Sequence, residues 1–235
     1  MNRFLERLPL FQGLSSAQLS AAESACALRR FRQGQIVFEE GKPADAVWVL
    51  AQGWVFLKKR SSNGGMATLL VLTPTESICG ISALEGAAYT ATAVAGTDAQ
   101  LVSIPSKAFI RLLDRSPALT RRMLQLCCRR LQRLAEAISM SQAPVQQRMA
   151  YMLLRLRRAL GQKLPLTHQE LASLIGTRWE TSIRTLSLMK RQGLVASSRR
   201  EITILSPQRL AALLGPNGAG QAFLRNGATG HASSP

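Results

Sequence analysis

Residues 164–204 read LPLTHQELASLIGTRWETSIRTLSLMKRQGLVASSRREITI, and this stretch decides the fold of the C-terminal part of the chain. Thr167 is followed three residues later by Glu170, which is the spacing of a capping box at the start of a helix. The pattern predicts a short helix over residues 168–174, with Leu171 and Leu174 facing inward.

A second helix is expected after a tight turn. Gly176 can adopt the positive φ that such a turn requires, and the run from Arg178 to Thr181 starts the next helix. The inward face of that helix would carry Ile183, Leu186 and either Met189 or the apolar stem of Lys190. Two short helices joined by a glycine-containing turn form a helix-turn-helix. In that motif the second helix places its N-terminal residues in the major groove of DNA.

The residues after the second helix predict a β-hairpin. Gln192-Gly193-Leu194-Val195 ends the helix and starts a strand, Ser197-Ser198-Arg199-Arg200 forms a basic tip, and residues 201–204 return as a second strand. Such a hairpin is a wing whose arginines would meet phosphate. An unrelated helix pair followed by a hairpin is the alternative, and the basic bias and the order of the elements argue against it.

Upstream, residues 116–139 contain no glycine, and their proline stands only at the start, where a helix tolerates it. Apolar residues recur there at spacings of four, three, four and three, which is the seam of two packed helices. The seam residues are Leu124, Cys128, Leu131, Ala135 and Ile138. We expect a parallel homodimer, because one such helix cannot bury its seam alone. The alternative is a helix that packs on its own domain.

Between Phe31 and about Pro105 the chain alternates short β-type runs with turn residues, a texture typical of a sandwich or small barrel. A helical segment over residues 15–27, with Ser15 as its N-cap, precedes this part. The expected organisation is α+β, with these parts: a β-rich sensor domain over 1–115, a dimerisation helix over 116–140, a hinge over 141–144, a winged helix-turn-helix over 145–214 and a disordered tail over 215–235.

Composition narrows the function classes. Thirty Lys and Arg against 13 Asp and Glu give a formal net charge of +17, and the segment from Pro144 onward holds 13 basic and 3 acidic residues. This excess suggests a polyanionic partner. No apolar run is long enough for a membrane span, and the four cysteines lack metal-type spacing. We therefore expect a cytoplasmic protein with reduced thiols and no metal site.

Taken together, these parts resemble the CRP/FNR superfamily, the group of the cyclic-AMP receptor protein and the fumarate–nitrate regulator. The resemblance covers about residues 8–214. It includes Leu10-Phe11-Gln12-Gly13-Leu14, the β-roll series from Gly34 to Asp45 with Gly53, Arg129-Arg130-Leu131-Gln132 in the dimer helix, and Glu180-Thr181 with Arg184 in the second helix. It implies a bacterial transcription regulator with an N-terminal jelly-roll-like β-roll.

The resemblance assigns base-reading roles to Glu180 and Arg184 and implies a TGA-like half-site. A carboxylate can accept from cytosine N4, and an arginine can pair bidentately with guanine. Ile183 could contact a thymine methyl or pack inward, and Trp179 replaces a third base-reading arginine of one branch. Phosphate contacts are expected from Thr167, His168, Arg178, Lys190, Arg191, Arg199 and Arg200.

The resemblance argues against cyclic AMP as the signal. The positions that hold the nucleotide in the cyclic-nucleotide branch read here as Cys79-Gly80, Tyr89-Thr90 and Leu134-Ala135. These residues remain the candidates for an effector pocket, although the charge partner of the phosphate is replaced. A clustered-cysteine iron–sulfur site is not supported either. Haem would need an unusual ligand such as Cys79, because both histidines lie outside the sensor part.

The main prediction is a homodimeric regulator of double-stranded DNA, controlled by an unknown signal and contacting RNA polymerase if it is an activator. A redox- or haem-dependent gas sensor of the same family is the first alternative, and a charge-driven membrane-surface protein is the second. An enzyme is not expected, since the first 167 residues contain no histidine and no nucleophile–base set is recognisable.

Overall fold

The structure is a computed structural model, and it describes residues 5–6, 8–60, 64–74, 76–78 and 80–215. The chain divides into two compact units, Met1–Ala135 and Glu136–Pro235. Helix α5, Pro117–Ser141, contains the boundary between the units. Cys79 and all but the first residue of the predicted tail lie outside the described residues.

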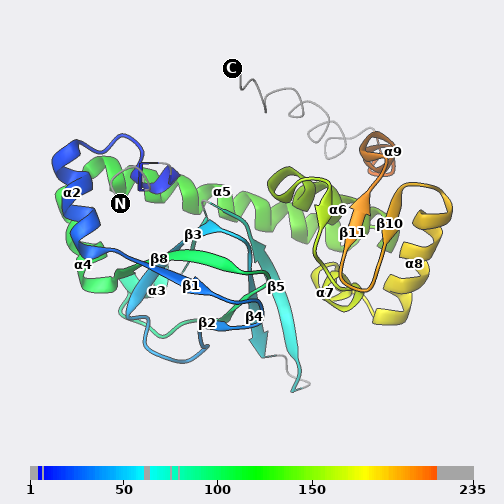
Figure 1. Cartoon of the computed structure of the whole chain (residues 1–235), viewed down its shortest axis with the longest axis horizontal. Coiled ribbons are helices and arrows are strands. Elements are labelled where there is room, and N and C mark those ends of the chain that lie inside the picture. Colours follow the sequence, from blue (N-terminus) through cyan, green and yellow to red (C-terminus); the bar gives the residue numbers. More distant parts are fainter. Residues whose placement is uncertain (1–4, 7, 61–63, 75, 79, 216–235) are drawn as a thin grey trace. The chain divides into compact units, whose positions relative to one another are not determined.

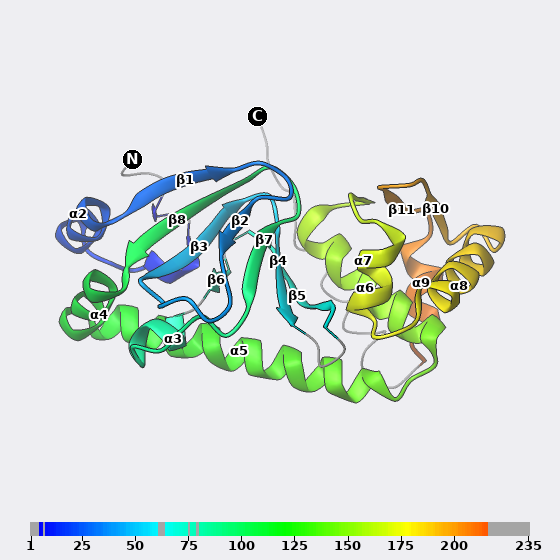
Figure 2. The same cartoon turned by 90° about the horizontal axis from the view of Figure 1, so that it is seen from below.

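The first unit contains two four-stranded antiparallel sheets (Figures 1 and 2). One sheet has the order β1-β8-β3-β6, and the other has the order β2-β7-β4-β5. Their strands are β1 Ala27–Phe31, β2 Ile36–Phe38, β3 Ala46–Gln52, β4 Val55–Arg60, β5 Met66–Leu72, β6 Ser77–Ile78, β7 Thr92–Ala95 and β8 Ala99–Pro105. This arrangement confirms the β-rich N-terminal domain expected from the short, turn-punctuated apolar runs.

Alternation along the strands of the first sheet supplies two separate cores. In β3, Leu50 packs in a cluster with Val55 and Leu57 of the second sheet, whereas Val47 and Val49 pack with residues of the flanking helices. Because successive side chains of a strand point to opposite faces, both faces of this sheet are covered. The turn after β3 needs Gly53, whose φ is +80° and where a Cβ would overlap the Asp98 carbonyl oxygen.

Helices cover the outer face of the first sheet. They are η1 Pro9–Phe11, α2 Ser16–Ala25, α3 Gly80–Leu84, α4 Ser106–Arg115 and the first part of α5. Phe109 of α4 and Leu119 and Met123 of α5 belong to the core on this face. Ser15 caps α2 as predicted, through a capping box with Gln18. The predicted helix over 15–27 is too long, because Ala27 already pairs with Ser103 in the sheet.

The second unit contains the predicted pair of short helices and the hairpin. Its elements are α6 Val145–Leu160, β9 Lys163–Leu164, α7 His168–Leu174, α8 Trp179–Arg191, β10 Val195–Ser197, β11 Ile202–Ile204 and α9 Pro207–Ala212. The sheet has the order β10-β11-β9, so a third short strand that the sequence pattern did not indicate extends the hairpin. No helix in the described part of the chain has the length and apolar composition needed to cross a membrane.

Candidate nucleic-acid interface

The first two turns of α8 carry an exposed polar face. Glu180 and Arg184 are both exposed, and their spacing of four residues places them on the same side of the helix. Neither side chain has a hydrogen-bond or ion-pair partner among the residues that the structure describes. The carboxylate and the guanidinium group are therefore both available to a ligand that offers donors and acceptors side by side.

The opposite side of α8 anchors the helix in the second unit. Leu186 and Met189 are buried, as the sequence pattern predicted, and Ser182 is fully buried as well. Ile183 is half-buried, so it lies between the anchored side and the exposed polar face. Trp179 stands at the first position of α8 and is 52% exposed. A large aromatic side chain thus lies open to solvent beside Glu180.

The turn before α8 is built from local and non-local contacts. The Thr167 side chain accepts from the Glu170 backbone N–H, and the Glu170 carboxylate accepts from the Thr167 backbone N–H at 2.9 Å, which completes the predicted capping box. Gly176 has a φ of +61°, as the tight turn requires. Arg148 of α6 donates from Nη1 to the Gly176 carbonyl oxygen at 3.2 Å. The capping box thus fixes the start of α7, and the contact of Arg148 ties the turn before α8 to α6.

A hollow of about 530 Å³ brings together residues from three elements of the second unit. It is lined by Thr167, His168, Gln169, Trp179, Arg199 and Arg200. Arg199 and Arg200 lie at the exposed tip of the hairpin, where the Ser198 N–H donates to the Glu201 carbonyl oxygen. The structure thus places four of the predicted phosphate-contacting residues around one open hollow, next to Trp179.

Two of these predicted contacts are constrained by the structure. The Thr167 hydroxyl lies 2.9 Å from the Glu170 carboxylate oxygen, and its backbone N–H donates to the same oxygen, so both donors of this residue serve the capping box. The Nε2 atom of His168 is buried and has no hydrogen-bond partner among the described residues. Of these four residues, Arg199 and Arg200 at the exposed hairpin tip are therefore the ones whose side chains are most available to bind phosphate.

The remaining predicted phosphate contacts lie elsewhere on α8. Arg178 is the exposed N-cap residue, and its side chain makes no capping hydrogen bond. Lys190 and Arg191 lie in the last turn, roughly 17 Å along the helix from Trp179 at about 1.5 Å per residue. Arg191 is seven residues after Arg184 and shares its face, whereas Lys190 is turned away from that face.

Sequence reasoning missed Gln169 and Arg148. Gln169 follows His168 in the first turn of α7, so its place beside the other lining residues could have been found from the capping box. Arg148 contacts a residue 28 positions further along the chain, and no local pattern signals that contact.

The candidate effector residues of the first unit differ in their burial. Tyr89 is buried, and its ring stacks on Phe38 with 4.1 Å between ring centroids. Its hydroxyl donates to the Asp45 carboxylate at 2.9 Å and accepts from the Trp48 indole N–H at 3.3 Å. Thr90 and Ala135 are exposed, and Leu134 is half-buried. Gly80 begins α3, and Cys79 lies outside the described residues.

The described cysteines are free thiols. Burial, and to a smaller extent the charge of Glu23, raises the pKa of Cys26 to about 12. Burial also raises the pKa of the half-buried Cys127 thiol, while Cys128 is exposed. Within the described ranges no group of three or more histidine, cysteine or acidic residues lies close enough to hold a metal ion.

The predicted seam of α5 forms a row of exposed apolar side chains. Leu124, Leu131 and Ile138 are 61%, 66% and 71% exposed. Cys128 and Ala135 are exposed between them. Within the first unit, Leu119 and Met123 of the same helix are buried instead. The first unit therefore covers one apolar face at the start of α5, whereas the seam side chains of α5 are exposed.

Two family models match the chain, one in each unit. Residues 28–116 match the cyclic nucleotide-binding domain, and residues 147–213 match the Crp-like helix-turn-helix domain. The cyclic AMP receptor protein of Thermus thermophilus is 33% identical over 189 residues, covering 80% of this chain and 88% of that protein. The global nitrogen regulator of Synechococcus elongatus is 29% identical over 215 residues, covering 87% and 95%.

Solved structures share the fold. A CRP-family transcriptional regulator from Thermus thermophilus superposes with a TM-score of 0.71 at 22% identity, covering 80% of this chain and 96% of that chain. FixK2 from Bradyrhizobium japonicum superposes with a TM-score of 0.70 at 20% identity, covering 80% and 96%. At these identities the likeness concerns the fold alone.

Proposed function

The chain belongs to the CRP/FNR family of transcription regulators, with a helix-turn-helix DNA-binding domain, and from this premise we propose that it acts as a homodimer on a pseudo-palindromic DNA site with TGA-like half-sites. Its relatives are regulators and not enzymes. RNA polymerase is the expected further partner if the protein activates transcription.

The observation that carries the DNA-reading proposal is the pair formed by Glu180 and Arg184. Both side chains are exposed, unpartnered among the described residues and on one face of α8. A carboxylate can accept from cytosine N4, and an arginine can donate to guanine O6 and N7. We assign the hairpin arginines Arg199 and Arg200, together with Arg178 and Arg191, to the phosphates beside the site. Trp179 would meet the outer part of each half-site.

The exposed seam supports the homodimer. An isolated helix that leaves three large apolar side chains more than half exposed gains free energy when a second copy covers them. In a symmetric dimer the two copies of α8 would read half-sites about one helical turn apart, roughly 34–36 Å. The seam residues Leu124, Cys128, Leu131, Ala135 and Ile138 are the ones we assign to this contact.

Substitution of Arg184 tests the reading assignment. We expect Arg184→Ala to weaken binding to the selected site by about 1–3 kcal/mol and to relax the preference for guanine at one position, because a bidentate contact is lost. Binding is measured by fluorescence anisotropy on the specific site, on single-base variants and on scrambled DNA, at fixed salt.

Arg209→Ala is the matched control, since Arg209 is an exposed arginine of the same domain on α9. It should lower affinity for specific and scrambled DNA equally, if at all. Equal losses on both kinds of DNA for Arg184→Ala would contradict the assignment.

We further propose that the signal is not cyclic AMP, although relatives from Thermus thermophilus and Mycobacterium tuberculosis carry that nucleotide in their names. A cyclic phosphate needs a cation, and Tyr89 occupies the position of that cation in the nucleotide-binding branch. A tyrosine phenol is never cationic, and burial raises the pKa of Tyr89 to about 12, so this side chain offers no positive charge to a phosphate. Its hydroxyl is also already bonded to Asp45 and Trp48.

Two measurements separate the candidate signals. Calorimetric titration with cyclic AMP should give no saturable heat, and a saturable micromolar response would contradict the proposal. An absorption spectrum of protein purified without oxygen tests the alternative regulator of the same family. A haem or iron–sulfur band would establish that alternative and direct attention to Cys79, whereas a spectrum without such bands would favour an organic ligand or a thiol switch.

A further inference from the structure

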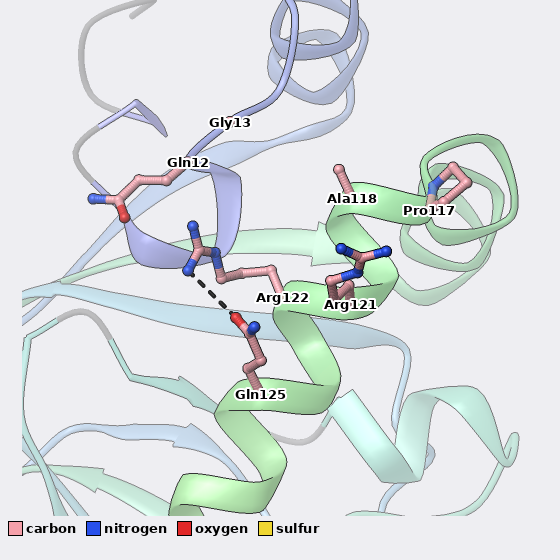
Figure 3. Close-up of a pocket in the computed structure, with 7 residues that line it drawn as sticks. All are labelled: Gln12, Gly13, Pro117, Ala118, Arg121, Arg122 and Gln125. Carbon is pink, nitrogen blue, oxygen red and sulfur yellow. Dashed lines mark hydrogen bonds between the residues drawn. The ribbon is translucent and has the colours of Figure 1, made fainter.

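A hollow of about 360 Å³ lies between the loop after η1 and the first turns of α5 (Figure 3). Gln12 and Gly13 line it from the loop, and Pro117, Ala118, Arg121, Arg122 and Gln125 line it from the helix. In Figure 3 the Arg122 guanidinium group extends toward the loop and is held by a hydrogen bond from its Nη1 atom to the Gln125 amide oxygen, at 3.4 Å. The wall thus combines two arginines with two side-chain amides.

The two arginines are not balanced by acidic residues. Neither Arg121 nor Arg122 has a carboxylate partner among the described residues, and the first turn of α5 contains no acidic residue. Arg122 is half-buried, so part of its hydration is already lost. An adjoining hollow of about 540 Å³ shares Arg121, Arg122 and Gln125 and adds Arg129. Positive charge therefore continues along this side of the helix, and none of these arginines has a carboxylate partner in the part of the chain that the structure describes.

We propose that this hollow is a binding site for a phosphate-bearing anion, which Arg121 and Arg122 hold by charge and the side-chain amides of Gln12 and Gln125 orient. Guanidinium groups present paired N–H donors that fit phosphate oxygens bidentately. The amides can donate to the remaining oxygens. Pro117 and Ala118 add an apolar wall, which suits an organic phosphate as well as the inorganic ion.

The site lies beside the seam that the proposed homodimer would use, and its regulatory consequence rests on that proposed function. Arg121 precedes the seam residue Leu124 by three positions, so the two side chains are neighbours on the helix surface. A second copy would bring a second set of these arginines to the same end of the interface. Because like charges repel, an anion bound at each copy would strengthen dimerisation.

Direct binding is tested with inorganic pyrophosphate on the full chain. Isothermal titration at constant ionic strength should give saturable binding, and Arg121→Gln combined with Arg122→Gln should weaken it by about tenfold or more. The control is Arg157→Gln combined with Arg209→Gln, which removes two exposed arginines that line neither this hollow nor the one at the hairpin tip, and it should leave this binding in place. Equal binding by the Arg121/Arg122 variant and the unaltered chain would overturn the site.

A residue-level measurement distinguishes binding at this hollow from binding at other cationic parts of the chain. Phenylglyoxal modifies accessible arginines, and pyrophosphate should reduce modification of Arg121 and Arg122 more than that of Arg209, as measured by peptide mass spectrometry. Phenyl phosphate replaces pyrophosphate in a second arm. Stronger protection by phenyl phosphate would indicate an organic phosphate ligand, and stronger protection by pyrophosphate an inorganic one. No protection by either would contradict the proposal.

Sedimentation velocity tests the coupling to dimerisation. The monomer–dimer equilibrium should shift toward dimer by about tenfold when pyrophosphate replaces chloride at equal ionic strength, and the Arg121/Arg122 variant should not respond. A chain that binds pyrophosphate at this site but stays monomeric would contradict the homodimer and leave the site intact. A dimer whose stability is the same in both salts would contradict the coupling and leave the homodimer intact.

Discussion

Tyr89 links two strands of the first unit through its ring and its hydroxyl. The ring stacks on Phe38 of β2, and the hydroxyl bonds to Asp45 and to Trp48 of β3. The same side chain stands where the family resemblance expects part of an effector pocket. The Tyr89 side chain therefore occupies this part of the interior, and both its ring and its hydroxyl already have partners.

Removing the hydroxyl measures these contacts. We expect Tyr89→Phe to lower the free energy of unfolding by about 1–3 kcal/mol, because the Trp48 indole N–H and the Asp45 carboxylate lose a partner. Urea unfolding followed by tryptophan fluorescence gives the value. Thr90→Ala, at the exposed neighbouring position, should change it little. An unchanged midpoint for Tyr89→Phe would show that the hydroxyl does not stabilise the fold.

The Tyr89 phenol makes the free energy of unfolding depend on pH between about pH 10 and 12. Its pKa rises from 10.0 to about 12 in the folded chain. The folded state therefore holds this proton more tightly, and the contribution is present below pH 10 and is lost as the pH rises toward 12. The alkaline loss of stability should be smaller in Tyr89→Phe than in the unaltered chain.

Among the elements of secondary structure, helices α2 and α7 begin at residues that cap them locally. Ser15 and Thr167 both close capping boxes with the side chain three residues on. Each box satisfies backbone N–H groups that a helix leaves without partners. Both N-caps were predicted from the sequence, and for Thr167 so was its capping-box partner Glu170, because that partner is only three residues away.

The capping box of α7 gives a prediction of magnitude. Thr167→Ala should lower the free energy of unfolding by about 1 kcal/mol, since the Glu170 N–H loses its acceptor. Thermal or urea unfolding measures the change. Thr177→Ala in the following turn is the comparison, because its side chain makes no hydrogen bond in the described structure. A larger loss at Thr177 than at Thr167 would contradict the capping account.

At the scale of the whole molecule, the homodimer depends on the open apolar face of α5. We expect Leu131→Asp to raise the dimer dissociation constant by at least about tenfold, because a charge would be buried in the seam. Sedimentation velocity over a range of concentrations measures the constant. Leu205→Asp is the control, since Leu205 is an exposed leucine outside α5. Similar effects of both substitutions would argue against a seam at Leu131.

Elements that depend on local interactions were predictable from the sequence. Three such features are the capping pair Thr167 and Glu170, the positive φ of Gly176 and the repeat of apolar residues along α5. Each involves residues close together in the chain, so the amino-acid sequence is enough to predict it. The family resemblance added roles for Glu180 and Arg184, which stay predictions until DNA binding is measured.

Contacts between residues far apart in the sequence became visible in the folded chain alone. Arg148 reaches the Gly176 carbonyl across 28 residues, and Tyr89 reaches Trp48 across 41. Gln12 and Arg121 share a hollow although most of the first unit separates them along the chain. Such contacts depend on how sheets and helices pack. Packing brings together residues that are far apart in the chain, and no local sequence pattern predicts which of them will meet. The capping box of Thr167 and Glu170 could therefore be predicted from the sequence, whereas the side-chain contacts of Tyr89 and the cationic hollow at α5 could not.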